Sequence, residues 1–261
     1  MTALPSVFVS HGSPDLVLHD CPARHFLQAL PAQLDRLPAA ILTISAHWNT
    51  RQPAVSVAVE MTALHDFYGF PKELNRLEYH APGAPALAAR VRALLDDAGI
   101  ESDAVERSQL DHGAWAPLLL MYPDGQIPIA QLSIQPRASL EHHMQVGRAI
   151  ASLRQENVLI LASGSVTHNL GAFGAYGINS PPPDWVKEFD DWLADAIARN
   201  DLEALSNYRQ LAPYARQNHP TQEHLLPLFV ALGAGGLQVA GRQIHSSFTY
   251  GAFSMAAYAF A

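Results

Sequence analysis

Three short apolar runs in this chain lead into histidines, and this arrangement restricts the folds open to it. The first run ends at His11, the second ends at His47, and the third lies just before His168. Short apolar runs bounded by turn residues are typical of buried strands. In an open α/β sheet, the carboxyl ends of parallel strands border one crevice, where ligands bind. We therefore expect side chains that are far apart in the sequence to meet at one edge of a sheet.

Segments with the period of a helix separate these runs, which predicts an α/β fold. We expect a single domain over residues 1–261, with a central mostly parallel or mixed sheet and helices on both faces. The expected strands are 6–10, 40–46, 54–60, 128–134, 157–162 and 237–244, with one or two more in 245–260. The expected helices are 22–36, 84–98, 114–121, 139–153, 184–199, 201–206 and 221–233. The aromatic-rich segment 61–83 has neither period, as is common in binding loops and lids.

Size and composition exclude several classes of partner. The chain has 261 residues, of which 49% are hydrophobic and 15% charged, as in a soluble globular protein. The formal net charge is −8 and there is no basic stripe, which argues against nucleic acid and against an anionic membrane surface. Pro227 and a glycine cluster interrupt the uncharged stretch 225–241, so no membrane-spanning helix is expected. A single cysteine, Cys21, and the lack of a signal-peptide pattern predict a cytoplasmic protein.

His11 and His47 are candidate metal ligands, because imidazoles at two strand ends can converge on one ion. The third ligand stays open. Glu223 and His224 are adjacent, and on the predicted helix they point about 100° apart, so only one of them can face the site. Glu223 would complete a two-histidine, one-carboxylate triad for Fe(II), and His224 would give three imidazoles for Fe(II) or Zn(II). His219 is a further candidate.

Two more histidines have alternative roles. His168 is either a fourth ligand or an acid/base group beside the metal, and a catalytic site benefits if it stands back from the ion. His112, at a loop-to-helix start, either caps the helix or binds a substrate oxygen. Two histidines of the aromatic-rich segment are undecided: His65 and His80. Four others are expected to be solvated: His19, His25, His142 and His143.

Six sequence blocks together resemble the class III extradiol ring-cleaving dioxygenases, with their catalytic LigB-type subunit. The most similar branch is the 4,5-DOPA dioxygenase extradiol-like group. The blocks are Ser10–Pro14, Ser45–Trp48, His65–Pro71, Asp111–Pro117, Ser163–Leu170 and His219–Leu228. Each block alone is weak, but six in order are specific. With the closing block Phe248–Met255, the resemblance covers nearly the whole chain.

The resemblance implies one divalent metal, which is Fe(II) for activity or Zn(II) as often found bound in this branch. It implies that His11, His47 and His224 hold the metal, with His168 beside it as an acid/base group. His112 would contact the substrate or share in the proton transfers. In the wider protocatechuate-type relatives the third ligand is a glutamate, whereas this chain carries the histidine of its branch.

The resemblance also implies the reaction. A small aromatic diol, such as a DOPA-like catechol, and O₂ would meet at the metal, and ring opening next to the diol would give a muconic semialdehyde. An apolar pocket is expected from five aromatic residues: Trp48, Phe67, Tyr68, Trp115 and Phe248. Two alternatives remain, namely a Zn-dependent hydrolase and a non-catalytic, Memo-like binding protein on the same scaffold. The sequence gives no prediction of oligomeric state.

Overall fold

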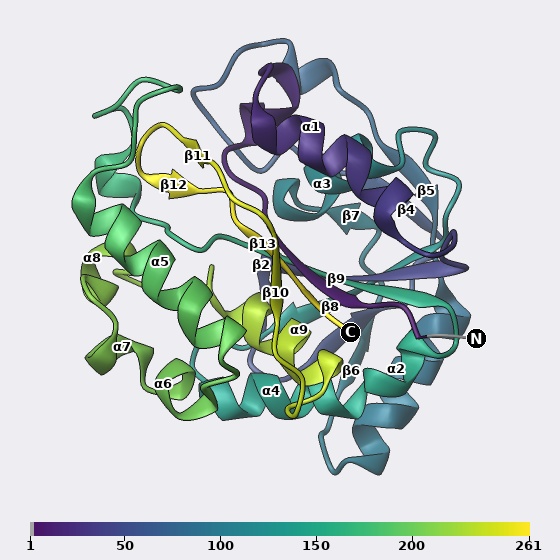
Figure 1. Ribbon diagram of the computed structural model, residues 1–261. Coiled ribbons are helices and arrows are strands. Elements are labelled where there is room, and N and C mark those ends of the chain that lie inside the picture. Colours follow the sequence, from purple (N-terminus) through teal and green to yellow (C-terminus); the bar gives the residue numbers. More distant parts are fainter. Residues whose placement is uncertain (1–2) are drawn as a thin grey trace.

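A mixed eight-stranded sheet forms the centre of the computed structural model, which describes residues 3–261 (Figure 1). The strand order is β10 (Arg242–His245), β13 (Ala257–Phe260), β1 (Ser6–Ser10), β9 (Val158–Gly164), β2 (Ala40–Asn49), β8 (Ile129–Ile134), β3 (Ala54–Ser56) and β6 (Asp103–Val105). The four inner strands, β1, β9, β2 and β8, run parallel to one another. On the outer sides, β13 is antiparallel to β1, and β3 is antiparallel to β8.

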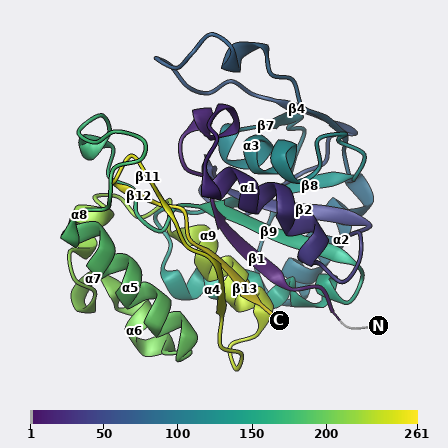
Figure 2. The same cartoon turned by 45° about the horizontal axis from the view of Figure 1, so that its top comes forward.

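Helices cover both faces of this sheet, as Figures 1 and 2 show. The helices on one face are α2 (Pro85–Asp97), α4 (Leu140–Ala149), α5 (Asp184–Ala198) and α9 (Leu226–Gly235). The opposite face carries α1 (Pro22–Ala29), α3 (His112–Met121) and a small sheet of β5 (His80–Pro82), β4 (Glu60–Ala63) and β7 (Gln109–Leu110). The inner strands are therefore buried on both sides, which explains their continuous apolar sequences. Along β2, for example, Ile41 packs into one core and Leu42 and Ile44 into the other.

Short elements complete the chain. The helical ones are α6 (Leu202–Ser206), α7 (Tyr208–Leu211), α8 (Ala215–Asn218) and the 3₁₀ turns Pro14–Leu18, Leu30–Gln33, Leu74–Arg76, Ala151–Arg154 and Leu170–Ala172. A two-stranded hairpin is formed by β11 (Phe248–Thr249) and β12 (Phe253–Ser254). No helix among residues 3–261 has the length and apolar character needed to cross a membrane.

The predicted fold class is confirmed, but several element boundaries were wrong. The expected helices 22–36 and 139–153 end earlier, at Ala29 and Ala149, and three other boundaries also differ. The expected strand 54–60 is divided between β3 and β4, and the expected strand 237–244 begins only at Arg242. The expected helix 221–233 begins at Leu226, so His224 precedes it. Pro227 explains this shift, since it has no N–H to donate to a preceding helical turn and is tolerated only in the first turn of a helix.

His143 is buried instead of solvated, with 1% of its surface exposed. Its Nδ1 lies 2.9 Å from the carbonyl oxygen of Ser139, and the backbone N–H of Gln135 donates to its Nε2 at 3.2 Å. These two partners require the neutral ring with its hydrogen on Nδ1. Burial lowers the pKa of His143 to about 4.

This burial predicts acid sensitivity of the fold. The unfolded chain takes up a proton on this ring below about pH 6.5, whereas the folded chain does so only near pH 4. Stability is therefore fully present above pH 6.5 and falls as the pH drops from there toward 4. Between pH 7.5 and pH 5, His143 alone contributes a loss of about 2 kcal/mol in the free energy of unfolding. Urea titrations in EDTA should show a smaller pH dependence for His143→Gln than for the wild type, and an equal dependence would contradict this account.

Candidate metal centre

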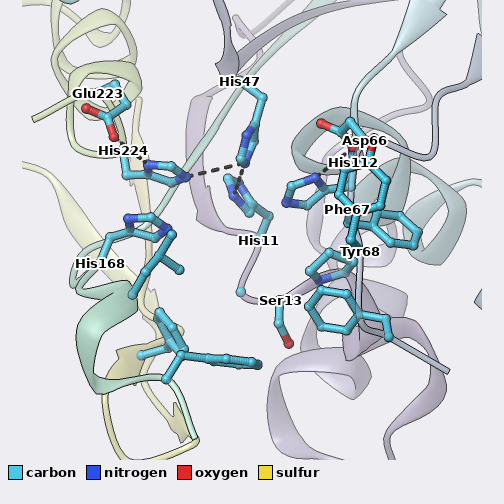
Figure 3. Close-up of a pocket in the computed structure, with 16 residues that line it drawn as sticks. His11, Ser13, His47, Asp66, Phe67, Tyr68, His112, His168, Glu223 and His224 are labelled. Carbon is cyan, nitrogen blue, oxygen red and sulfur yellow. Dashed lines mark hydrogen bonds and ion pairs between the residues drawn. The ribbon is translucent and has the colours of Figure 1, made fainter. Parts of the chain in front are cut away.

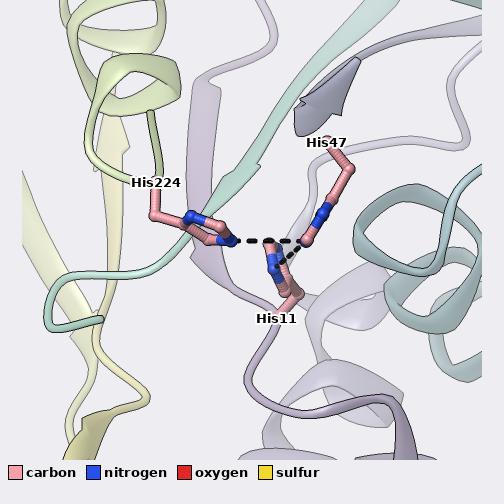
Figure 4. A group of neighbouring side chains, drawn as sticks. All are labelled: His11, His47 and His224. Carbon is pink, nitrogen blue, oxygen red and sulfur yellow. Dashed lines mark hydrogen bonds between the residues drawn. The ribbon is translucent and has the colours of Figure 1, made fainter. Parts of the chain in front are cut away.

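Three histidines from distant parts of the sequence meet at the carboxyl end of the inner strands (Figure 4). His11 follows β1 directly, His47 lies within β2 near its carboxyl end, and His224 lies in the turn before α9. The Nε2 atom of His47 is 3.2 Å from Nε2 of His11 and 3.3 Å from Nε2 of His224. The sequence placed the first two correctly at one edge of the sheet.

The local structure fixes the protonation of His11. Its Nδ1 lies 2.9 Å from the hydroxyl oxygen of Ser163, a residue of β9. That hydroxyl donates its only hydrogen to the carbonyl oxygen of Gly113. Ser163 therefore has only a lone pair to offer His11, so Nδ1 of His11 carries the hydrogen and donates. The lone pair of Nε2 is left free toward His47 and His224.

Burial keeps all three rings neutral at pH 7. Desolvation, followed by the neighbouring histidines, lowers the pKa of His11 and His224 well below the usual value. Desolvation and His112 lower the pKa of His47 to about 4. Neutral imidazole is the form that binds metals.

The three rings fit a divalent ion. Bonds of 2.0–2.1 Å from imidazole to Zn²⁺ or a similar ion place two ligand nitrogens about 2.9–3.4 Å apart. The two separations that involve Nε2 of His47, 3.2 and 3.3 Å, lie in this range. The Nδ1 of His224 is buried without a hydrogen bond, and it lies 3.4 Å from a carboxylate oxygen of Glu223.

Neither alternative for the third position joins His11 and His47. Glu223 groups with His168 and His224 instead. His219 is fully buried, and its Nε2 lies 2.7 Å from the carbonyl oxygen of Val166. A backbone hydrogen bond explains the placement of His224, because the N–H of Ser165 donates to its carbonyl oxygen at 2.8 Å and holds this turn against the end of β9.

Gly113 allows the rings of His11 and His47 to approach the first turn of α3. A Cβ at this position would lie 2.6 Å from the hydroxyl of Ser45, 2.9 Å from Cδ2 of His47 and 3.0 Å from Cε1 of His11. All three contacts are shorter than ordinary van der Waals distances. Ser45 cannot yield easily, since its hydroxyl donates to the buried carboxylate of Asp111 at 2.5 Å.

We expect Gly113→Ala to lower metal affinity about 10- to 100-fold, the range typical when the support of a ligand is lost. The added methyl group must displace His11 or His47. Competition with a chromophoric chelator measures the affinity. Gly177→Ala is the matched control, because the nearest atom to its added Cβ is at an ordinary 3.5 Å. Wild-type affinity in Gly113→Ala would show that the two rings do not share an ion.

His112 lies beside the three histidines, and its partner Asp66 was missed by the sequence analysis. One carboxylate oxygen of Asp66 accepts the backbone N–H of His112 at 3.0 Å and lies 2.9 Å from its Nδ1. Burial opposes ionisation of Asp66, but the hydrogen bonds from His112 outweigh it and lower the pKa of this carboxyl group. The ionised Asp66 can only accept, so Nδ1 of His112 carries a hydrogen and Nε2 remains for a ligand. The cap of α3 is Asp111, whose side chain accepts from the N–H of Ala114, so His112 is not the capping residue.

His168 stacks on His224 instead of joining His11 and His47. The two ring centroids are 3.4 Å apart and the planes differ by 7°. Desolvation, followed by His47, lowers the pKa of His168 to about 4, so the ring is neutral at pH 7. A neutral ring next to the three histidines can accept a proton.

A cavity of about 550 Å³ opens in front of these histidines (Figure 3). Its aromatic wall consists of Phe67, Tyr68, Phe70, Phe173 and Phe253. Only Phe67 and Tyr68 of this wall were predicted. The rings of Phe70 and Phe173 come from separate loops, with centroids 6.2 Å apart.

Three aromatic residues expected in the pocket do not line it. Trp115 is buried beneath the wall and donates its indole N–H to the carbonyl oxygen of Leu64. Trp48 is buried under the guanidinium of Arg107, 5.1 Å from the ring centroid. Phe248 belongs to the β11–β12 hairpin, which contributes Phe253 instead. The sequence does not show which aromatic rings line the cavity, because the conformation of the loops decides which ring faces it.

Comparison with known proteins identifies the family. The family described as the catalytic LigB subunit of aromatic ring-opening dioxygenase matches residues 5–261. The chain belongs to this family. The resemblance seen in the six sequence blocks is thus confirmed.

Curated relatives of this LigB-family chain carry a more specific name. The 4,5-DOPA dioxygenase extradiol of Beta vulgaris is 40% identical over 97% of this chain and 95% of its own length. The protein of the same name from Escherichia coli K12 is 40% identical over 89% of this chain and 86% of its own length. With the family match, these relatives identify the chain as an oxidoreductase of the extradiol ring-cleaving dioxygenase class.

A solved structure supports the same fold. The crystal structure of an uncharacterized protein from Escherichia coli K12 superimposes on this LigB-family chain with a TM-score of 0.83. The two are 34% identical, and the match covers 99% of this chain and 100% of the other.

Proposed function

We propose that this chain is a metal-dependent extradiol dioxygenase that inserts O₂ into a catechol ring and yields a muconic semialdehyde. The observation that carries the proposal is the meeting of three neutral imidazoles, from His11, His47 and His224, at one wall of an aromatic-lined cavity. Three protein ligands leave coordination positions open, as catalytic sites require. The names of the curated relatives make a DOPA-like diol the substrate class to test first.

His11, His47 and His224 would hold the ion, with Fe(II) for activity and Zn(II) able to occupy the same ligands. When bound, the ion supplies open positions for both diol oxygens and O₂ and a path for electrons from the ring to oxygen. His168 serves in this proposal as an acid/base group and not as a fourth ligand. Its stacking against His224 supports that assignment.

The residues around the ion would move protons and orient the ring. His168, neutral at pH 7, accepts a phenolic proton from the incoming diol and returns a proton as the ring opens. His112, whose Nδ1–H is held by Asp66, directs Nε2 toward a diol oxygen. Phe67 and Phe253 supply apolar surface against the ring and displace water from it. We place the enzyme in the cytoplasm, because its one cysteine, Cys21, is buried and unpaired.

Anaerobic loading with Fe(II), addition of L-DOPA or 4-methylcatechol, and then a pulse of O₂ test the proposal. We expect uptake of one O₂ for each ring opened and a yellow semialdehyde absorbance that depends on added Fe(II). Turnover of ester or amide substrates by the Zn(II) form without O₂ would support the hydrolase alternative. Metal binding without any turnover would support a Memo-like binding protein.

A further inference from the structure

Asp190 is a buried carboxylic acid outside the cavity, and the proposed reaction does not use it. It lies in α5, and 3% of its surface is exposed. The other buried residues of α5 are apolar and share one face of the helix: Val186, Phe189, Leu193, Ala196 and Ile197. Burial of a carboxylate among them costs free energy, which hydrogen bonds must offset. The hydrogen-bond donor to Asp190 therefore indicates what this residue does.

That donor is Ser254, in the β11–β12 hairpin. The helix α5 packs beside this hairpin (Figure 2). The Ser254 hydroxyl donates its only hydrogen to a carboxylate oxygen of Asp190 at 2.5 Å. Burial raises the pKa of Asp190 to about 6, although the hydrogen bond from Ser254 opposes this rise. At pH 7 the carboxyl group is therefore mostly ionised and acts as an acceptor for Ser254.

Ser254 connects Asp190 to the aromatic wall of the cavity. The preceding residue, Phe253, lines the cavity, and its ring centroid is 6.1 Å from that of His168. Neighbouring side chains of a strand point to opposite sides, so Ser254 faces α5 while Phe253 faces the cavity. The Ser254 hydroxyl oxygen also accepts the backbone N–H of Ala256 at 3.2 Å. These bonds hold the backbone that carries Phe253.

The backbone of Ser254 also holds the segment that carries His168. Its N–H donates to the hydroxyl oxygen of Thr167 at 2.7 Å, and that hydroxyl donates to the carbonyl oxygen of Ala252 at 2.9 Å. Thr167 is fully buried and directly precedes His168. A shift of Ser254 would therefore displace both Phe253 and the backbone next to His168.

A second path joins α5 to His168. The backbone N–H of His168 donates to the carbonyl oxygen of Asn218 at 3.0 Å. The side-chain amide of Asn218 donates in turn to the carbonyl oxygen of Trp185 at 2.8 Å. Trp185 lies in the first turn of α5. One helix outside the cavity thus holds the segment of His168 through two separate sets of hydrogen bonds.

We propose that Asp190 is a positioning residue, which acts through Ser254 on the acid/base group His168. Through the same contact it orients Phe253 against the ring of the diol. This inference rests on the proposed function, in which His168 exchanges protons with the substrate. A displacement of about 1 Å between reacting groups costs about 100-fold in rate, so a small shift of this imidazole lowers kcat strongly.

Ser254→Ala removes the contact between α5 and the hairpin. We expect kcat for 4-methylcatechol with the Fe(II)-loaded enzyme to fall about 10- to 100-fold. Metal affinity, measured by competition with a chromophoric chelator, should stay that of the wild type. Asp190→Ala should lower kcat equally. The double variant should lose no more than either single variant, because both substitutions remove the same interaction.

Ser6→Ala is the matched control for a loss of stability. Ser6 is a fully buried serine of β1, outside the cavity, and its hydroxyl donates to the carbonyl oxygen of Ala231 at 2.6 Å. This variant should lower the urea midpoint of unfolding about as much as Ser254→Ala but keep the wild-type kcat. Asp190→Asn retains an oxygen that can accept the Ser254 hydroxyl, so it should keep most of the wild-type kcat. Thr167→Val breaks the same path nearer to His168 and should lower kcat without loss of metal affinity.

Wild-type kcat in Ser254→Ala or in Thr167→Val would overturn the positioning role and leave the proposed function standing. An equal loss of kcat in Ser6→Ala would also overturn it, because reduced stability would then explain the effect. So would a loss in Asp190→Asn as large as that in Asp190→Ala. Absence of catechol turnover by the Fe(II)-loaded wild type would overturn the proposed function and this inference with it.

Discussion

His47→Ala should lose stoichiometric metal and lower kcat/KM for a catechol by about 1,000-fold or more. His47 is the ring that lies within 3.3 Å of both other histidines, so its removal leaves two ligands that no longer surround an ion. Metal analysis after dialysis, together with O₂ uptake, measures both effects. The remaining activity should not recover with added Fe(II) at concentrations that saturate the wild type.

His25→Ala is the control for this experiment. Its ring is 63% exposed, and it lies in α1, outside the cavity. This variant should keep wild-type metal content and activity. Full metal content in His47→Ala would mean that the ligand set is wrong, even if activity were lost.

His168→Gln should separate proton transfer from metal binding. We expect kcat to fall about 100- to 10,000-fold, which is the range for loss of a general acid/base group. Metal content should stay near that of the wild type, because His168 stacks on His224 and does not join His11 and His47. Glutamine cannot take up a proton at neutral pH, although it retains polar atoms at the same site.

His80→Gln is the matched control for His168→Gln, because the His80 side chain is exposed. This variant should keep the wild-type kcat and the wild-type metal content. Loss of metal from His168→Gln would make His168 a fourth ligand. Retention of both metal and kcat would remove it from the mechanism altogether.

The central sheet could be predicted from the sequence because its inner strands are buried on both faces. Such strands consist of continuous apolar runs, and β1, β2 and β9 each match one. The edges of elements were less predictable. The start of α9 depends on Pro227, whose effect outweighs the apolar period of the residues before it.

The candidate site was partly predictable for the same reason. Parallel strands bring His11 and His47 to the carboxyl-end edge of the sheet, and this placement does not depend on the conformation of the loops. The choice between Glu223 and His224 was not predictable, because both lie in a turn where the spacing rule of a helix does not apply. Asp66 was missed because only tertiary contact pairs it with His112. The Asp66–His112 contact joins residues far apart in sequence, and no local pattern marks it.

The most direct test of the metal centre is anomalous diffraction from crystals of the Fe(II)-loaded protein, grown anaerobically without zinc. We predict one iron peak, bonded at about 2.1 Å to Nε2 of His11, His47 and His224 and not to His168. An iron peak elsewhere, or one ligated by Glu223 in place of His224, would contradict the account.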